Sequence, residues 1–339
     1  MPGPLLDTLK GLKQDIPPVW LMRQAGRYLP EYRELRADKG GFLALVYDSK
    51  AAAEITVQPV RRFGFDGAIL FSDILIVPHA MGQGLEFMAG EGPKLSPTLL
   101  ESTLDDFTPA KERFEPIYET VRQTRAQISD AVTMLGFAGS PWTVATYMIA
   151  GQGSKDQGPA RLLAYQDPAR MQAIVDAIIK VSVEYLRGQI DAGAEAVQLF
   201  DSWAGSLAPD EFERWVVAPN VTITAAIKQS HPDTPVIGFP KGAGAKLPAY
   251  ARETGVDAVG LDETLDPDWA HANLPENMPV QGNLDPLLVE AGGPALPLRV
   301  KAIVEAFEDR PHVFNLGHGI GQFTPIEHVE QLLGALRGG

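Results

Sequence analysis

A repeated order of short apolar run, loop and helix-like segment constrains the fold of this chain more than any other feature. The apolar runs are nearly continuous, as is typical of strands buried on both faces of a parallel sheet. The eight runs are Trp20–Met22, Gly67–Phe71, Ala131–Phe137, Ala196–Phe200, Pro235–Phe239, Ala258–Leu261, Pro279–Gly282 and His312–Leu316.

Helical patterns separate most of these runs, and several begin with proline, which is tolerated in a first helical turn. They cover Ser49–Phe63, Phe114–Ile128, Pro168–Ala192, Pro209–Gln229, Pro297–Phe307 and Pro325–Leu336. Eight strands alternating with helices predict an α/β fold, namely a single (β/α)8 barrel domain over residues 1–339 with an N-terminal lead-in at 1–17. A doubly wound open sheet is the main alternative. We favour the barrel because no strand is followed by a G-x-G-x-x-G loop.

Two insertions interrupt this pattern. Glycines alternate with larger residues in Met81–Leu95, which predicts a small hairpin beyond the second strand. The polar segment Gln152–Gly158 is either a lid loop over a site or a plain surface excursion.

The composition excludes several classes of function. A net charge of −14 argues against a nucleic-acid surface, which needs clustered Lys and Arg. The absence of cysteine excludes disulfides and thiolate metal sites. No apolar run is long enough to span a membrane, and the start of the chain lacks a basic leader with an apolar core. A cytoplasmic protein is therefore expected.

The segment Trp20–Pro30 places two guanidiniums, those of Arg23 and Arg27, on either side of Ala25-Gly26. Arginine binds carboxylates or phosphates through a planar fork, and small residues let backbone N–H groups approach the same anion. The alternative is a pair of surface ion pairs. In so acidic a chain, an anion site must be locally basic.

Polar residues follow nearly every apolar run, at the barrel end where active sites are formed. Asp262 and Asp285 are most simply turn or cap residues, whereas Asp201 suits a cap and a site equally. Lys241 fits a Schiff-base lysine, a point charge for an anion, or a solvated side chain. No histidine spacing suits a metal, so no metal site is predicted. His318, between glycines after the last run, is a candidate for binding.

Six blocks of sequence resemble the uroporphyrinogen decarboxylase family, in that family's order and across about residues 18–329. They are Trp20–Pro30, Phe71–Leu75, Gly136–Thr143, Phe200–Gly205, Gly282–Pro286 and Asn315–Ile320. One departure is Gly321-Gln322-Phe323, where a more polar, proline-bearing stretch is expected, and it affects only the rim of the site.

The resemblance implies a (β/α)8 barrel, usually a homodimer, that needs no metal or organic cofactor. Such enzymes are carboxy-lyases of haem biosynthesis, which convert uroporphyrinogen III to coproporphyrinogen III by turning four acetate side chains into methyls. Carried onto this chain, Asp73, Arg23 and Arg27 would be catalytic. The substrate-binding residues would be Arg23, Gln24, Ala25, Gly26, Arg27, Phe42, Asp73, Tyr147, Ser202 and His318.

The chemistry of that reaction suits these residue types. Peripheral carboxylates need arginines, and the inward pyrrole N–H groups need an acceptor such as Asp73. A ring protonated on carbon is its own electron sink, and Asp73 would stabilise its positive charge. The general acid stays open between an arginine and a water or substrate acid held by the arginines, because a guanidinium is a poor proton donor.

Three other classes of protein explain these residues less well. Related barrels that transfer methyl groups bind zinc through His and Cys, and this chain has no cysteine. A silent tetrapyrrole carrier would need the arginines but not Asp73. An aldolase built on Lys241 leaves Arg27 and Asp73 without a role.

Overall fold

Seven parallel strands form one sheet in the computed structural model, which describes residues 3–88, 92–154 and 156–338. The strand order is β1-β4-β5-β6-β7-β8-β9. Their bounds are β1 (Gly67–Ile69), β4 (Thr133–Gly139), β5 (Ala196–Asp201), β6 (Val236–Pro240), β7 (Ala258–Gly260), β8 (Val280–Leu284) and β9 (His312–Leu316). A doubly wound sheet reverses its order partway, whereas this one follows the chain from edge to edge. The barrel-like arrangement is therefore confirmed over the open-sheet alternative.

The first predicted strand, Trp20–Met22, does not form a strand, and this part of the prediction is wrong. Val19 instead makes one isolated parallel bridge to Phe314 of β9, and the Phe314 N–H donates to the Pro18 carbonyl over 2.8 Å. On its other side, the Val19 carbonyl accepts from the Asp66 N–H at 2.8 Å. The segment thus lies between the two edge strands and bridges them with few hydrogen bonds.

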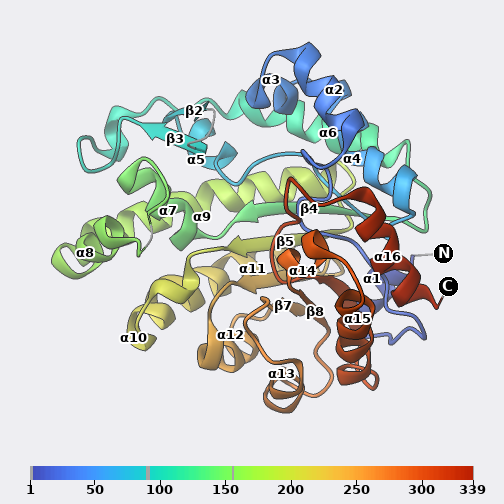
Figure 1. Ribbon diagram of the computed structural model, residues 1–339. Helices are drawn as coiled ribbons and strands as arrows, with labels where there is room; N and C mark the ends of the chain where they lie inside the picture. Colours follow the sequence, from blue (N-terminus) through green and yellow to red (C-terminus); the bar gives the residue numbers. More distant parts are fainter. Residues whose placement is uncertain (1–2, 89–91, 155, 339) are drawn as a thin grey trace.

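Helices surround the sheet, as Figure 1 shows. Their bounds are α1 (Pro4–Leu9), α2 (Pro30–Lys39), α3 (Phe42–Tyr47), α4 (Ser49–Phe63), α5 (Ile76–Ala80), α6 (Glu115–Arg125), α7 (Pro141–Ala150), α8 (Gly158–Gln166), α9 (Pro168–Asp191), α10 (Pro209–Phe212), α11 (Ala218–Ser230), α12 (Leu247–Glu253), α13 (Pro267–Asn273), α14 (Pro286–Ala291), α15 (Ala295–Ala306) and α16 (Ile326–Arg337). The helix predicted over Pro209–Gln229 is divided by a π-helical turn at Glu213–Val217. Within the described residues, no helix has the length and apolar character needed to cross a membrane.

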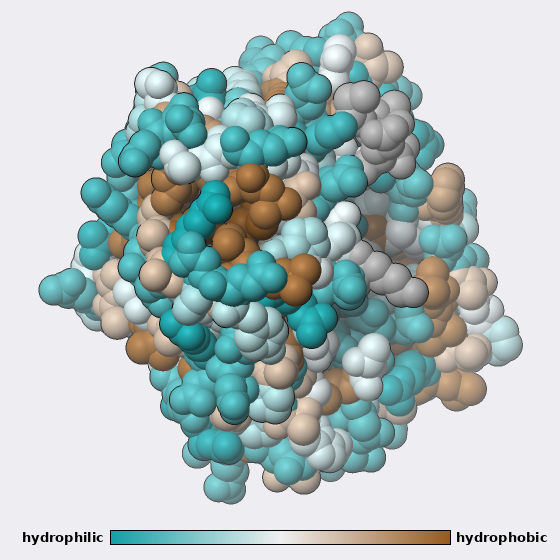
Figure 2. Space-filling view, turned by 90° about the vertical axis from the view of Figure 1, so that its left-hand side faces the viewer, coloured by the Kyte–Doolittle hydropathy of each residue, from teal (hydrophilic) through white to brown (hydrophobic). Residues whose placement is uncertain are grey.

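The first insertion is a hairpin, as predicted. β2 (Gly84–Met88) pairs antiparallel with β3 (Gly92–Ser96), and residues 89–91 at its tip lie outside the described residues. Its Phe87 ring packs 4.4 Å from that of Phe42. The hairpin, α7 and α8 lie on the side of the molecule that Figure 2 presents, where hydrophobic residues gather between hydrophilic ones. Lys155, in the second insertion, also lies outside the described residues. That the segment Gln152–Gly158 acts as a lid stays a prediction.

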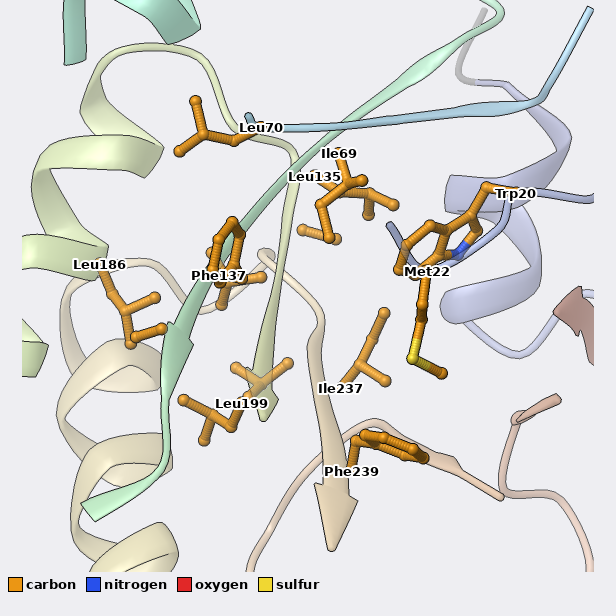
Figure 3. Close-up of a cluster of buried hydrophobic side chains, with 14 of the residues drawn as sticks. Trp20, Met22, Ile69, Leu70, Leu135, Phe137, Leu186, Leu199, Ile237 and Phe239 are labelled. Atoms are coloured by element: carbon orange, nitrogen blue, oxygen red, sulfur yellow. The ribbon is translucent and has the colours of Figure 1, made fainter. Parts of the chain in front are cut away.

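The core contains a polar chain within an apolar cluster. Figure 3 shows Trp20 and Met22 gathered with side chains from the strands, and all of these residues are buried. The Trp20 indole Nε1 donates to Gln281 Oε1 at 2.9 Å, and Gln281 Nε2 donates to Gln198 Oε1 at 2.9 Å. A buried amide is costly unless it is hydrogen-bonded. These two hydrogen bonds therefore provide partners for the amide groups of Gln281 and Gln198, which interrupt the apolar runs of their strands.

Asp201, the last residue of β5, ties that strand to α7. Its buried Oδ1 accepts from the Thr143 hydroxyl at 2.5 Å, and the Thr143 oxygen accepts from the Trp203 N–H at 3.1 Å. Its Oδ2 has no hydrogen-bond partner among the described residues. Burial raises the pKa of Asp201 to about 7, against the opposing effect of Thr143. These contacts favour the structural interpretation of Asp201.

We expect Asp201→Asn to stabilise the protein at alkaline pH. The folded carboxyl binds its proton more tightly than the exposed carboxyl of the unfolded chain. The wild type therefore loses stability as the pH rises from about 4 to about 7. The variant lacks this loss and should exceed the wild type at pH 8 by on the order of 2 kcal/mol. Urea unfolding at pH 5 and pH 8 measures the difference, and identical pH dependence in both proteins would contradict it.

Candidate active site

The side chain of Gln24 fixes the loop that follows Trp20 by hydrogen bonds to the backbone. Its Oε1 accepts from the Leu21 N–H at 3.0 Å, and its Nε2 donates to the Gly67 carbonyl at 2.8 Å. The Met22 N–H donates to Asn315 Oδ1 at 3.0 Å. Gln24 is fully buried, so its side chain acts on the site by shaping the loop.

Both predicted guanidiniums, those of Arg23 and Arg27, are exposed on this loop. Among the described residues, no carboxylate lies within 4.0 Å of either one, so the alternative of surface ion pairs is not realised there. Arg23 has a left-handed backbone, with φ of 61°. Its stem crosses Gly319, where an added Cβ would lie 2.2 Å from Arg23 Cδ. The loop thus presents two cations whose side-chain donors have no hydrogen-bond partner among the described residues.

Asp73 stands just beyond β1, at the carboxyl end of the sheet. Its Oδ1 accepts from the Leu75 N–H at 2.8 Å, which fixes the orientation of the carboxylate. Burial raises the pKa of Asp73 to about 6, and the Leu75 hydrogen bond and the Arg23 charge oppose that rise. The group is therefore mostly ionised at pH 7, yet it sits where water screens it poorly.

Tyr147 projects from α7 toward the same region. Its pKa is raised, chiefly by burial and further by the Asp73 charge, whereas Arg23 acts in the opposite direction. The Tyr147 ring lies 6.5 Å from that of Trp203, and an added Cβ at Gly153 would lie 3.4 Å from the Tyr147 hydroxyl. Asp73, Arg23 and Tyr147 are therefore close enough to affect one another electrostatically.

His318 follows β9 and is half-buried beside Arg23. Burial, together with the smaller effects of the Arg23 and Lys241 charges, lowers its pKa to about 3, and Asp262 opposes this shift. The imidazole is thus neutral, so it can donate one hydrogen bond. Its Nδ1 is buried and has no partner among the described residues. A neutral ring with a free nitrogen suits hydrogen bonding to a ligand.

The other predicted binding residues line the surroundings. Phe42 packs 5.4 Å from Phe71 and forms an apolar wall. Ala25 is half-buried, and a Cβ at Gly26 would come 2.8 Å from the Arg23 carbonyl. Ser202 is half-buried on the turn after β5. That these groups touch a substrate stays a prediction.

Several polar residues at the strand ends have structural partners. The Asp262 carboxylate accepts from the Gly242 N–H at 2.7 Å, and Asp285 caps α14 through the Leu287 N–H at 2.8 Å. The expectation of turn and cap roles for both is confirmed. Phe323, in the segment Gly321-Gln322-Phe323 that differs from the family's pattern, is 75% exposed. The described part of the chain holds no group of three or more His, Asp or Glu placed to bind a metal.

Three neighbours of the site were not anticipated. The Trp203 ring lies near that of Tyr147 at a tilt, Gly319 leaves room for the Arg23 stem, and the Glu263 carboxylate lies 3.4 Å from the Lys241 ammonium. Trp203 and Gly319 each adjoin a predicted site residue in the sequence, so adjacency was an available signal. Glu263 had none, because Asp262-Glu263 looks like an ordinary turn.

Solved structures share the fold. A methyltransferase from Methanosarcina mazei superimposes with a TM-score of 0.80 at 17% identity, covering 99% of this chain and 97% of that one. A B12-independent methionine synthase from Shewanella gives a TM-score of 0.56 at 12% identity, with 96% and 97% covered. At these identities the likeness concerns the fold alone.

Sequence relatives are much closer. The chain is 69% identical over 338 residues to a uroporphyrinogen decarboxylase of Novosphingobium aromaticivorans, covering 100% of this chain and 99% of the relative. It is 69% identical over 337 residues to one of Erythrobacter litoralis, with 99% of each covered. A family model described as uroporphyrinogen decarboxylase matches residues 3–338. The chain therefore belongs to the uroporphyrinogen decarboxylase family.

Proposed function

We propose that this protein is a uroporphyrinogen decarboxylase, which converts the four acetate side chains of uroporphyrinogen III to methyls and releases coproporphyrinogen III in porphyrin biosynthesis. Family membership supports the reaction. One observation carries the assignment of the site: the Asp73 carboxylate, fixed by the Leu75 N–H, lies within electrostatic range of the Arg23 guanidinium, which has no carboxylate partner among the described residues.

The reaction requires an acceptor at the centre of the macrocycle and cations at its edge. The four pyrrole N–H groups point inward, and an ionised Asp73 accepts hydrogen bonds from them. The acetate and propionate arms carry negative charge, and Arg23 and Arg27 offer forked donors that no described carboxylate already occupies. Asp73 thus pins the ring while the arginines hold the arms.

Decarboxylation proceeds through a cationic ring. A proton adds to a pyrrole carbon, and the C–C bond to the carboxylate breaks with loss of carbon dioxide. The electron pair enters the ring and leaves an exocyclic methylene group. A proton then adds to that methylene, and the ring carbon loses the proton it gained. Asp73, poorly screened by water, stabilises the positive ring more than the neutral substrate, which is the condition for catalysis.

Tyr147, Ser202 and neutral His318 supply hydrogen-bonding groups around the ring. His318 adds no charge at neutral pH, because its pKa is lowered to about 3. His318 therefore orients the substrate through a hydrogen bond and adds no charge–charge attraction to its carboxylates. Phe42, with Phe71 behind it, offers an apolar surface for the macrocycle.

The family resemblance supports four further proposals. We propose that the whole chain forms one barrel domain, that the enzyme acts in the cytoplasm, and that it is a homodimer. We also propose that no metal or organic cofactor takes part, because the protonated ring supplies its own electron sink.

The reaction itself is tested by anaerobic incubation of chelator-treated protein with uroporphyrinogen III. Mass spectrometry should show stepwise loss of four carbon dioxide molecules. Tight binding without any mass loss would instead identify a tetrapyrrole carrier.

Replacing Asp73 should abolish most of the catalysis. We expect Asp73→Asn to lower kcat by about 100-fold or more, as removal of one preorganised electrostatic partner does. In the wild type, kcat/KM should fall as the pH drops through about 6, because Asp73 then gains a proton and loses its charge. Asp105→Asn, on an exposed turn, is the control. Near-normal turnover of the Asp73 variant would refute its role.

Arginine-to-lysine variants separate clamping from proton donation. Arg23→Lys and Arg27→Lys keep the charge but lose the fork. If the arginines clamp the substrate, KM should rise while the shape of the pH–rate profile stays unchanged. A new basic limb would identify the substituted residue as the proton donor. Arg299→Lys, exposed on α15, serves as the matched control.

A further inference from the structure

Lys241 follows β6 and presents a half-buried ammonium group with unused donors. Its nearest carboxylate oxygen, Glu263 Oε1, lies 3.4 Å from Nζ, and the exposed fractions of the two side chains are 26% and 24%. The pair does not meet the geometry of a hydrogen bond. Lys241 Nζ makes no hydrogen bond to any residue that the structure describes.

Two other part-buried lysines behave differently. Lys228 Nζ donates to the Thr234 carbonyl at 2.9 Å and to the Asp257 carboxylate at 2.9 Å. Lys246 Nζ, a few residues beyond Lys241, donates to the Leu207 carbonyl at 2.7 Å. Both are used to hold the fold. Lys241 has the burial of a structural lysine without the hydrogen bonds of one.

The topology places Lys241 across the barrel mouth from Arg23. The Pro18–Trp20 segment lies between β9 and the start of β1, so the ring order is this segment, then β1, β4, β5, β6, β7, β8 and β9. Three strands therefore separate β6 from the segment in either direction. Arg23 emerges from one wall, and Lys241 from the wall facing it.

The loop after β9, which carries His318, lies near both cations: Gly319 lies against the stem of Arg23, and Gly317 lies against Glu263, the neighbour of Lys241. The charges of Arg23 and Lys241 each lower the pKa of His318, while Asp262 opposes them. Glu263 Oε2 is buried without a hydrogen-bond partner among the described residues. A Cβ at Gly317 would lie 2.1 Å from the Glu263 backbone nitrogen, so the loops after β7 and β9 are in close contact.

We propose that Lys241 is a substrate-binding residue, which receives a carboxylate arm of the macrocycle on the wall opposite Arg23, with Glu263 as its counterion before substrate binds. This inference rests on the proposed function. A macrocycle held at its centre extends carboxylates to all sides. The loop that carries Arg23 and Arg27 lies on only one of these sides. The loosely paired ammonium can exchange Glu263 for the substrate at little cost.

The test compares steady-state kinetics of Lys241→Gln, Lys241→Arg and Glu263→Gln with the wild type, under anaerobic conditions with uroporphyrinogen III. Lys241→Gln should raise KM by about tenfold and leave kcat within about twofold, the pattern of lost uniform binding. Lys241→Arg should restore most of the affinity. Glu263→Gln should leave KM unchanged or lower it, because Lys241 then has no competing carboxylate. Lys180→Gln, exposed on α9, is the control for a charge lost elsewhere.

Several results would overturn the proposal. A wild-type KM for Lys241→Gln would show that the ammonium does not touch substrate. Equal KM effects of Lys241→Gln and Glu263→Gln would assign the pair a structural role, and thermal melting of both variants would show the matching loss of stability. A wild-type enzyme that releases no carbon dioxide would refute the proposed function, which is a separate failure.

Discussion

The docking of residues 18–24 between β9 and β1 is the contact on which the rest of the structure depends. Among the described residues, few backbone hydrogen bonds hold it, namely those linking Pro18 and Trp20 to Phe314, Val19 to Asp66 and Met22 to Ile320. The Asp66 carboxylate adds a bond from the Val19 N–H at 2.8 Å. The same short segment bridges the sheet edges, sends Trp20 into the polar chain of the core, and delivers Arg23 to the mouth. The segment that closes the barrel is therefore also the segment that positions Arg23.

The site reconciles an acidic protein with an acidic substrate. The chain carries a net charge of −14, so a polyanion is repelled at a distance. Close to the mouth the balance changes, because Arg23 and Arg27 have no carboxylate partner among the described residues and Lys241 has only a loose one. Asp73 is the exception, and under the proposed function its negative charge is matched by the pyrrole N–H groups. Distance-dependent screening lets the local cations dominate once the substrate has entered.

Much of this arrangement could be predicted from the sequence, because strands in such folds end where polar residues begin. The positions of Asp201 at the end of β5, of Asp73 and His318 beyond β1 and β9, and the helix from Ser49 to Phe63 follow from patterns of apolar residues and caps. The Trp20 segment could not be resolved in the same way, because an apolar run does not reveal how many ladder bonds its neighbours offer. The inward turn of Gln24 also has no local signal, since its partner Gly67 is distant in sequence. Long-range partners of this kind emerge only from the fold.

The backbone of Arg23 has a consequence for the evolution of the enzyme. A left-handed conformation costs a residue with a side chain about 1–2 kcal/mol, and glycine avoids most of this cost. Selection for stability alone would therefore replace Arg23 by glycine. Under the proposed function, an arginine is kept at this position because anion binding outweighs the local strain. With arginine at this position, the protein is less stable than the same fold would be with glycine there.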